Sequence, residues 1–394
     1  MSHSDPVVIV GLARTPMAAF QGEFSTVPVA ELGAVAVKGA LDESGIDAND
    51  VEQIIMGCVL AAGQGQAVAR QAGMAAGLSK HCEATTVNKM CGSAMQAAIL
   101  AHDTILAGSA NVIIAGGMEN MTGAPYVLPK ARGGYRMGNG QIIDTMMHDG
   151  LTDAYEGGPM GLFADMIANE YQFTREDQDA YAIESVARAR RAVDAGDFER
   201  EITPVTVKNR RGDIVVSEDA GPKNARPEKI PALRPVFNKD GTVTAANASS
   251  INDGAAALVL MKKSEAEKRG VKILAEIKAH AAHAHEPAYF TTAPVHAMNK
   301  VLAKAGWNKD DVDLWEINEA FAVVPMIAMR DMELDHDKVN VNGGACVLGH
   351  PIGASGARIM ATLIAAMEKR GVTKGVASLC IGGGEATAIA VERV

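Results

Sequence analysis

The chain has 394 residues, of which 48% are hydrophobic and 21% are charged, a balance typical of globular proteins and unlike that of disordered chains. At roughly 100–200 residues per domain, this length predicts two or three domains. A net charge of −10 argues against nucleic-acid binding, and no apolar run approaches the ~18 residues of a membrane span. We therefore expect a cytoplasmic protein that binds neither nucleic acid nor a membrane.

Apolar runs and helical spacings alternate through the first third of the chain. The expected elements, in order, are a strand at 7–10 closed by Gly11, a helix over 29–41, a strand at 82–87, a helix over 94–107 and a strand at 112–115. Such alternation favours parallel sheets with right-handed crossovers, so the fold class is α/β.

The middle of the chain, about 120–249, is richer in Met, Gly and charge, and one clear helix is expected over 175–195. Between Lys208 and Arg234 there are seven basic and four acidic residues, against the negative charge of the whole chain. This window is either a solvated surface hairpin or a site for a phosphorylated ligand.

Two segments are repeated at nearly the same spacing, which indicates a duplicated unit. Leu41-Asp-Glu-Ser-Gly45 resembles Leu302-Ala-Lys-Ala-Gly306, and each segment ends a helix at Gly before an apolar run. Val112-Ile-Ile-Ala-Gly116-Gly likewise resembles Ser378-Leu-Cys-Ile-Gly382-Gly. The two ends of the chain are therefore predicted to be copies of one unit.

Cysteine usage excludes a disulfide framework and a structural zinc site, because the chain has five cysteines and no Cys-x-x-Cys pair. Cys91 follows a predicted strand and precedes a helix of small residues. A thiol at a helix N-terminus is favoured as thiolate, so Cys91 is a candidate nucleophile, with a buried core cysteine as the alternative.

His350 lies among five glycines in the fifteen residues from 342 to 356, a density that suggests room for a ligand. Cys380 precedes Gly382-Gly383-Gly384, whose N–H groups can form an oxyanion hole, and Asn318 follows a strand at 314–317. Two thiols, one histidine, one amide and a glycine turn fit acyl transfer through a thioester. His280, His283 and His285 fit no zinc motif and are expected at a strand end.

Five motifs in order resemble those of the thiolase family, specifically its acetyl-CoA acetyltransferases. They are Val87-Asn-Lys-Met-Cys91-Gly-Ser93, Asn247-Ala-Ser249-Ser-Ile-Asn-Asp-Gly254, Asn318-Glu-Ala-Phe321, Gly349-His350-Pro-Ile-Gly353 and Cys380-Ile-Gly382-Gly-Gly384. The resemblance implies two βαβαβαββ halves in five α/β/α/β/α layers. It divides the chain into an N-terminal half at 1–121, completed by about 250–272, an inserted loop domain at 122–249 that covers coenzyme A, and a C-terminal half at 273–394.

The resemblance also implies a role for each motif residue. Cys91 would carry the acyl group, His350 would accept its proton, and Cys380 would exchange the α-proton of acetyl-CoA. Asn318 would hold a water that, with His350, stabilises the enolate, and the N–H groups of Cys91 and Gly382 would form a second oxyanion hole. The residues expected to contact the acyl group or coenzyme A are Leu151, Met160, Arg226, Phe237, Ala248, Ser249, Phe290, Ala320 and Phe321.

The activity implied is reversible Claisen condensation of two acetyl-CoA to acetoacetyl-CoA, with coenzyme A as substrate, no cofactor and no metal, in a homo-oligomer that is a dimer or tetramer. The alternatives are a 3-ketoacyl-CoA thiolase for longer or branched chains and a non-catalytic acyl-CoA- or lipid-binding protein. At 158–161 the chain reads Gly-Pro-Met-Gly where many family members have His-Met-Gly in the pocket loop.

Overall fold

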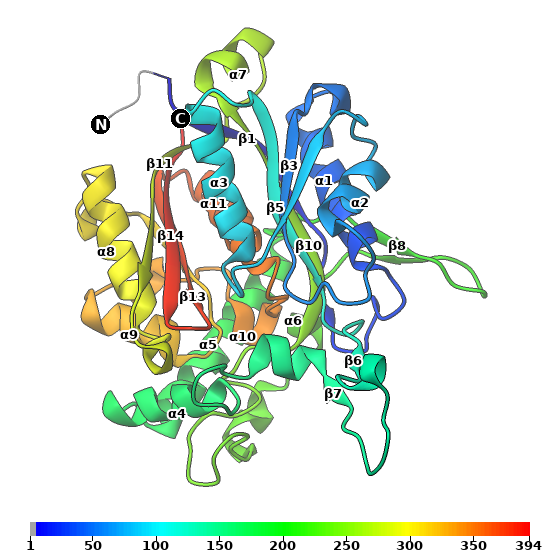
Figure 1. Ribbon diagram of the computed structural model, residues 1–394. Helices are drawn as coiled ribbons and strands as arrows, with labels where there is room; N and C mark the ends of the chain where they lie inside the picture. The colour runs from blue at the N-terminus through cyan, green and yellow to red at the C-terminus, as the bar shows by residue number, and fades with distance from the viewer. Residues whose placement is uncertain (1–4) are drawn as a thin grey trace.

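Alternating strands and helices build two similar units in the computed structural model, which describes residues 5–394 (Figure 1). The strands of both units join in one ten-stranded sheet of order β12-β13-β14-β11-β1-β10-β5-β3-β4, with β2 (Ala18–Ala19) paired to β10. The units meet where Val8 and Ile9 of β1 pair antiparallel with Glu276 and Ala275 of β11.

Apart from β4, which has no counterpart strand in the second unit, the two units have the same strand order and the same strand directions. In the first unit β3 runs parallel to both of its neighbours, β4 and β5, and β10 runs antiparallel to β5 and β1. In the second unit β12 is parallel to β13, and β14 is antiparallel to β13 and β11. The strands are β1 (Val7–Arg14), β3 (Gln53–Gly57), β4 (Glu83–Val87), β5 (Val112–Asn120), β10 (Asn252–Lys262), β11 (Ala275–Ala284), β12 (Leu314–Ile317), β13 (Lys374–Ile381) and β14 (Glu385–Glu392).

The repeated helix ends confirm the duplication. Gly45 and Gly306 cap helices α1 (Val29–Ser44) and α8 (Ala293–Ala305) with φ of 66° and 71°, a left-handed conformation that glycine adopts without steric cost. After each cap the chain makes a 3₁₀ turn and enters the corresponding strand, β3 or β12. The other helices of the two units are α2 (Val68–Ala75), α3 (Ser93–Leu106), α7 (Lys263–Arg269), α9 (Val323–Asp331), α10 (Ala345–Leu348) and α11 (Ser355–Arg370).

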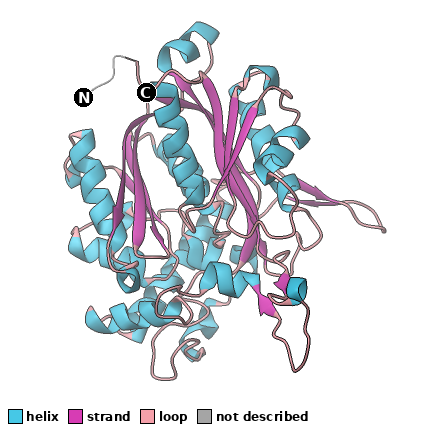
Figure 2. Ribbon diagram, viewed as in Figure 1, coloured by secondary structure: helices cyan, strands magenta, loops and turns pink. Residues whose placement is uncertain are grey.

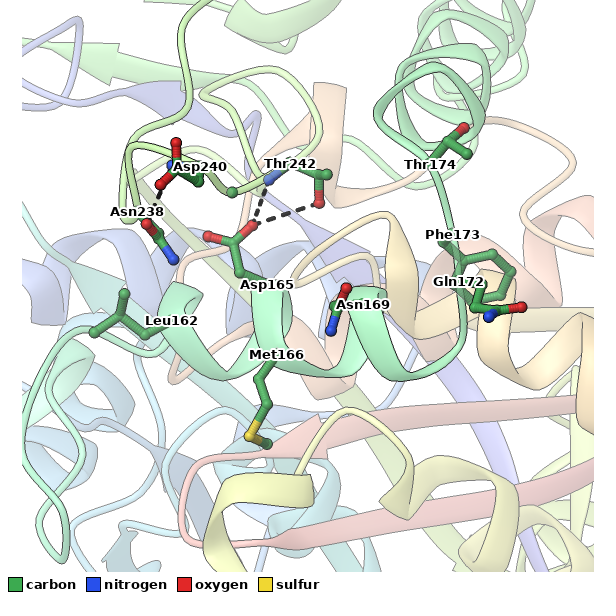
Figure 3. Close-up of a pocket in the computed structure, with 11 residues that line it drawn as sticks. Leu162, Asp165, Met166, Asn169, Gln172, Phe173, Thr174, Asn238, Asp240 and Thr242 are labelled. Atoms are coloured by element: carbon green, nitrogen blue, oxygen red, sulfur yellow. Dashed lines mark hydrogen bonds between the residues drawn. The ribbon is translucent and has the colours of Figure 1, made fainter.

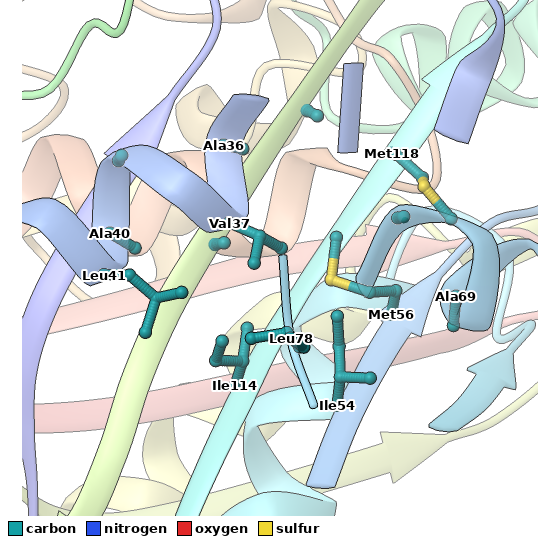
Figure 4. Close-up of a cluster of buried hydrophobic side chains, with 14 of the residues drawn as sticks. Ala36, Val37, Ala40, Leu41, Ile54, Met56, Ala69, Leu78, Ile114 and Met118 are labelled. Carbon is teal, nitrogen blue, oxygen red and sulfur yellow. The ribbon is translucent and has the colours of Figure 1, made fainter. Parts of the chain in front are cut away.

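The helices and sheets form the five layers that the sequence predicted (Figures 1 and 2). Helices α1 and α2 cover one outer face, where Val37 and Leu41 pack on Ile54 and Ile114 (Figure 4). Helices α3 and α11 lie between the two halves of the ten-stranded sheet, one half from each unit, and α8 and α9 cover the other outer face. Burial of these three apolar clusters is the main driving force for the arrangement.

Two strand ends were predicted too early. The strand expected at 112–115 is β5, which continues to Asn120, and the first strand also extends further than predicted. Gly11 does not end the first strand, because β1 continues to Arg14 with a register shift between Ile9 and Gly11. A Cβ atom at Gly11 would collide with the carbonyl oxygen of Ala40. The glycine therefore allows α1 to pack closely on the strand instead of stopping it.

The segment between the last two strands of the first unit contributes short elements and two longer helices. These are β6 (Tyr126–Val127), β7 (Ile143–Asp144), α4 (Gly161–Glu170), α5 (Arg175–Asp194), β8 (Val205–Val207), β9 (Ile214–Val216) and α6 (Ala220–Asn224). Thr174 and Asp177 form a capping box that starts α5. Strands β8 and β9 form a hairpin at Lys208, which was one of the two alternatives for the basic window. The domain limits at 121, 249 and 272 stay predictions. Across residues 5–394 no helix is long and apolar enough to cross a membrane.

Candidate active site

Cys91 lies on a tight turn between β4 and α3, as its sequence context indicated. Met90 has a φ of 47°, an uncommon left-handed conformation for a residue with a side chain. The Ser93 hydroxyl accepts a hydrogen bond from the Lys89 N–H at 2.9 Å and donates to the Met90 carbonyl at 2.7 Å. These bonds hold the turn, and α3 then begins at Ser93, two residues after the thiol.

Cys91 opens into a cavity of about 720 Å³ formed by segments from both units and from the inserted segment. Ten of the predicted site residues line it, and they are Cys91, Leu151, Met160, Ser249, Phe290, Ala320, Phe321, His350, Cys380 and Gly382. A volume of this size is typical of a pocket for a small ligand or a cofactor-sized one. The sequence motifs therefore converge in space, although they are spread over most of the chain.

The hydrogen bonds around His350 fix its tautomer. The Ser355 hydroxyl donates to the Pro351 carbonyl at 2.9 Å, so its oxygen can only accept from His350 Nδ1, at 2.6 Å. Nδ1 therefore carries the proton, and the lone pair is on Nε2. Asn318 Nδ2 donates to that Nε2 at 3.4 Å, while Arg358 Nη2 donates to Asn318 Oδ1, also at 3.4 Å, and so orients the amide.

Ser355 was part of the glycine-rich motif, but its sequence gave no sign of this role. Replacing Ser355 with alanine leaves the buried Nδ1–H of His350 without its acceptor, which costs about 1–3 kcal/mol. We expect Ser355→Ala to lower kcat for thioester chemistry roughly 5- to 150-fold. Steady-state kinetics should show this loss, whereas Ser44→Ala, which removes a buried helix-end hydroxyl in the first unit, should leave kcat unchanged.

The ionisation of Cys91 differs from the sequence-based expectation that its thiol has a lowered pKa. Burial raises the pKa of Cys91 to about 11, opposed by hydrogen bonds from the N–H groups of Gly382 and of Cys91 itself. Burial and the neighbouring Cys91 raise the pKa of Cys380 well above its ordinary value. Burial, with the nearby Arg358 charge, lowers the pKa of His350 to about 3. Near neutral pH the site therefore holds two thiols and a neutral imidazole, ready to accept a proton.

These pKa values predict a simple pH dependence for alkylation of Cys91 by iodoacetamide. Below a pKa of about 11 the thiolate fraction rises about tenfold per pH unit, and His350, neutral above its own low pKa, adds no second transition. The rate constant for alkylation should therefore rise log-linearly from pH 6 to pH 9. A plateau below pH 8 would mean that Cys91 is already a thiolate in the resting site.

Four predicted residues do not line the cavity. Asn318 contacts the cavity residue His350 through the hydrogen bond described above. Ala248 pairs with Phe321 in an isolated β-bridge. The Phe237 ring packs edge-on against Phe321 with 6.2 Å between centroids, so it supports the wall from behind. Arg226 is exposed and donates to the Ala225 carbonyl at 2.9 Å, which leaves its predicted contact with coenzyme A without support from the cavity.

Two residues of the site were missed from sequence. His148 lines the cavity, so the wall contains a histidine even though the 158–161 loop carries none. Glu119 is fully buried and accepts hydrogen bonds from the N–H groups of Val59, Leu60 and Gly353, and burial raises its pKa to about 7. It thereby joins the loop after β3 to the loop that carries His350. Its place at the end of β5 was visible in sequence, but its partners come from distant segments.

A second pocket, of about 570 Å³, lies over α4 (Figure 3). Asp165 points from α4 toward the loop after Phe237 and accepts hydrogen bonds from the N–H groups of Thr242 and Val243 at 2.7 and 2.9 Å. Both N–H groups donate to the same oxygen, Asp165 Oδ1, and these two bonds anchor the loop to α4.

Comparisons with known proteins agree with the fold. The family models "Thiolase, N-terminal domain" and "Thiolase, C-terminal domain" match residues 7–264 and 271–393. The chain is 48% identical over 389 residues to an acetyl-CoA acetyltransferase of Chromobacterium violaceum, covering 98% of this chain and 99% of that protein. It is also 48% identical over 397 residues to that of Saccharomyces cerevisiae, covering 99% and 100%. The chain belongs to the thiolase family.

Two solved structures confirm the thiolase fold. A thiolase from Ascaris suum in complex with coenzyme A matches with a TM-score of 0.94 at 42% identity, covering 99% of this chain and 100% of that chain. An acetyl-CoA acetyltransferase from Syntrophomonas wolfei matches with a TM-score of 0.96 at 41% identity and the same coverage.

Proposed function

We propose that the chain is an acetyl-CoA C-acetyltransferase that catalyses the reversible condensation of two acetyl-CoA to acetoacetyl-CoA and coenzyme A. One observation carries the proposal: two thiols, a neutral imidazole and the Gly382 N–H face one cavity. The names of the relatives point to the same activity. This chemistry needs no resident cofactor, because every proton and acyl group moves between substrate and side chains.

In thiolysis, Cys91 transfers its proton to His350 Nε2 and attacks the keto carbon of acetoacetyl-CoA. The N–H groups of Cys91 and Gly382 stabilise the resulting oxyanion, a contribution worth about 2.7–4 kcal/mol per donor. The carbon–carbon bond then breaks, and Cys380 protonates the released acetyl-CoA enolate. Coenzyme A then attacks acetyl-Cys91 and gives its thiol proton to the Cys380 thiolate. Acetyl-CoA leaves, and the His350 imidazolium returns its proton to the Cys91 thiolate, which restores the resting site.

The competing function is a 3-ketoacyl-CoA thiolase for longer chains. The test is the rate of thiolysis of acetoacetyl-CoA against that of a 3-ketoacyl-CoA of roughly eight to ten carbons. We expect a strong preference for acetoacetyl-CoA. A preference for the longer substrate would indicate a 3-ketoacyl-CoA thiolase for longer chains. No turnover of either substrate would support a non-catalytic acyl-CoA-binding protein.

Phe290 is the residue expected to limit acyl length. It is 3% exposed, lines the cavity, and packs edge-on against Phe321 at 6.2 Å. Phe290→Leu should raise kcat/KM for branched or longer substrates, relative to acetoacetyl-CoA, by about tenfold or more. Phe237→Leu is the matched control, because Phe237 packs on Phe321 at the same distance from outside the cavity and should leave the ratio unchanged.

A homo-oligomer, dimer or tetramer, and a cytoplasmic location are part of the same proposal. The arm that carries β6 and β7 projects from the body (Figure 1). Several apolar side chains of this arm are exposed to solvent. The exposed residues are Tyr126, Val127, Leu128, Met137 and Ile142. Such patches are typical of surfaces that a protein partner covers, and here a second copy of the chain is the partner we propose.

A further inference from the structure

Three histidines of the second unit lie close to one another, and none of them lines the active-site cavity. His283 is near the end of β11, His285 follows just after that strand, and His296 is on α8. One nitrogen from each ring lies within 4.8 Å of the other two. The ring centroids are 5.0, 4.4 and 5.6 Å apart, so the three imidazoles surround a common point.

The structure orients one of these rings for coordination. His285 Nε2 donates to the Tyr289 carbonyl at 2.9 Å, which places the lone pair of the neutral ring on Nδ1. A histidine that donates one N–H to a backbone carbonyl and presents its other nitrogen is the usual arrangement of a metal ligand.

His283 has an unsatisfied nitrogen beside the other two rings. Its Nε2 is buried and has no hydrogen-bond partner within residues 5–394, while Lys300 Nζ contacts its Nδ1 at 3.0 Å.

We propose that His283, His285 and His296 bind a divalent first-row transition metal ion, of the zinc class, with a fourth position open to water. Three neutral imidazoles suit Zn²⁺, Co²⁺, Ni²⁺ and Cu²⁺ and disfavour Mg²⁺ and Ca²⁺, which take oxygen ligands. With Zn–N bonds of about 2.0–2.1 Å, tetrahedral ligation requires nitrogens roughly 3.3 Å apart, so the rings need only a small inward shift.

Binding requires Lys300 to leave His283, because its ammonium would face the bound cation. Lys300 is exposed and its long side chain has solvent to turn into. The sequence placed His280 beside His283 and His285, but in the structure His280 lies in another cluster, with His102 and Asp103. The fold brings the third ligand from α8, so no sequence spacing could show the set.

The test is titration of the full-length, chelator-treated protein with Co²⁺ and Zn²⁺ in a Cys91→Ala background, which removes the half-buried active-site thiol as a competing ligand. We expect one equivalent of Co²⁺ to give visible d–d bands without a thiolate charge-transfer band, with affinity on the order of micromolar or tighter. Isothermal titration should give the same stoichiometry for Zn²⁺.

His296→Ala should weaken binding about tenfold or more. Lys300→Ala should strengthen metal binding, because it removes the ammonium that contacts His283. If the histidines had only a structural role, Lys300→Ala would not raise metal affinity. His81→Ala is the matched control, since His81 is exposed and outside the cluster, and it should leave affinity unchanged. Equal affinity in the wild type and His296→Ala, or no binding at millimolar Co²⁺, would overturn the proposal. The outcome is separate from that of the proposed function, because no step of the titration depends on turnover.

Discussion

Replacement of Cys91 by alanine is expected to lower kcat for acetoacetyl-CoA thiolysis by about 10⁴-fold or more. We propose that this thiol forms the acyl-enzyme, because it lines the cavity and the N–H groups of Gly382 and of Cys91 itself hydrogen-bond to its sulfur. Its loss removes the covalent intermediate, so both condensation and thiolysis should stop. Stopped assays at high enzyme concentration would measure the residual rate.

Cys82→Ala is the matched control for this loss. Cys82 is also a free thiol near β4, but it is 3% exposed and belongs to the core packed under α1 and α2. The control should keep kcat near that of the wild type while losing some stability, since a small buried side chain is removed. Substantial turnover by Cys91→Ala would show that the acyl group is carried elsewhere.

Cys380→Ser is expected to separate the two halves of the reaction. The hydroxyl is a far weaker acid–base group than the thiol, so condensation and carbon–carbon cleavage should fall by about 10²- to 10⁴-fold. Transfer of acetyl from acetyl-CoA to Cys91 needs no α-proton and should keep most of its rate. Exchange of labelled coenzyme A into acetyl-CoA measures this first half-reaction separately from acetoacetyl-CoA formation.

Cys346→Ser serves as the control for Cys380→Ser. Cys346 is another thiol of the second unit, close to Glu319, and it does not line the cavity. Cys346→Ser should leave the rates of coenzyme A exchange and of condensation near those of the wild type. If Cys380→Ser reduced exchange and condensation equally, the thiol would act in positioning or acylation and not on the α-proton.

The sequence predicted the architecture well because local signals repeat. The helix ends at Gly45 and Gly306 are set by glycine conformation within a few residues, and both lie where the repeat placed them. Cys91 likewise follows from a strand, a turn and a helix that are adjacent in the chain. Family motifs then placed His350 and Cys380 beside it, although they are far apart in sequence.

The remaining properties depend on contacts that sequence spacing does not carry. The thiol of Cys91 was expected to have a lowered pKa from its helix N-terminus, but burial outweighs that local effect. The tautomer of His350 depends on where the Ser355 hydroxyl points, which is set by its bond to the Pro351 carbonyl. The His296 ligand also comes from a different helix than the strand that carries His283.

The most direct test of the account is to incubate the enzyme with acetyl-CoA labelled in its acetyl group, quench it in acid, and map the label by peptide mass spectrometry. The label should lie on Cys91, be removed as acetyl-CoA by added coenzyme A, and be absent from Cys91→Ala. A label on any other residue that is chased at the rate of turnover, or turnover with no trapped acetyl group, would contradict the acetyl-Cys91 mechanism.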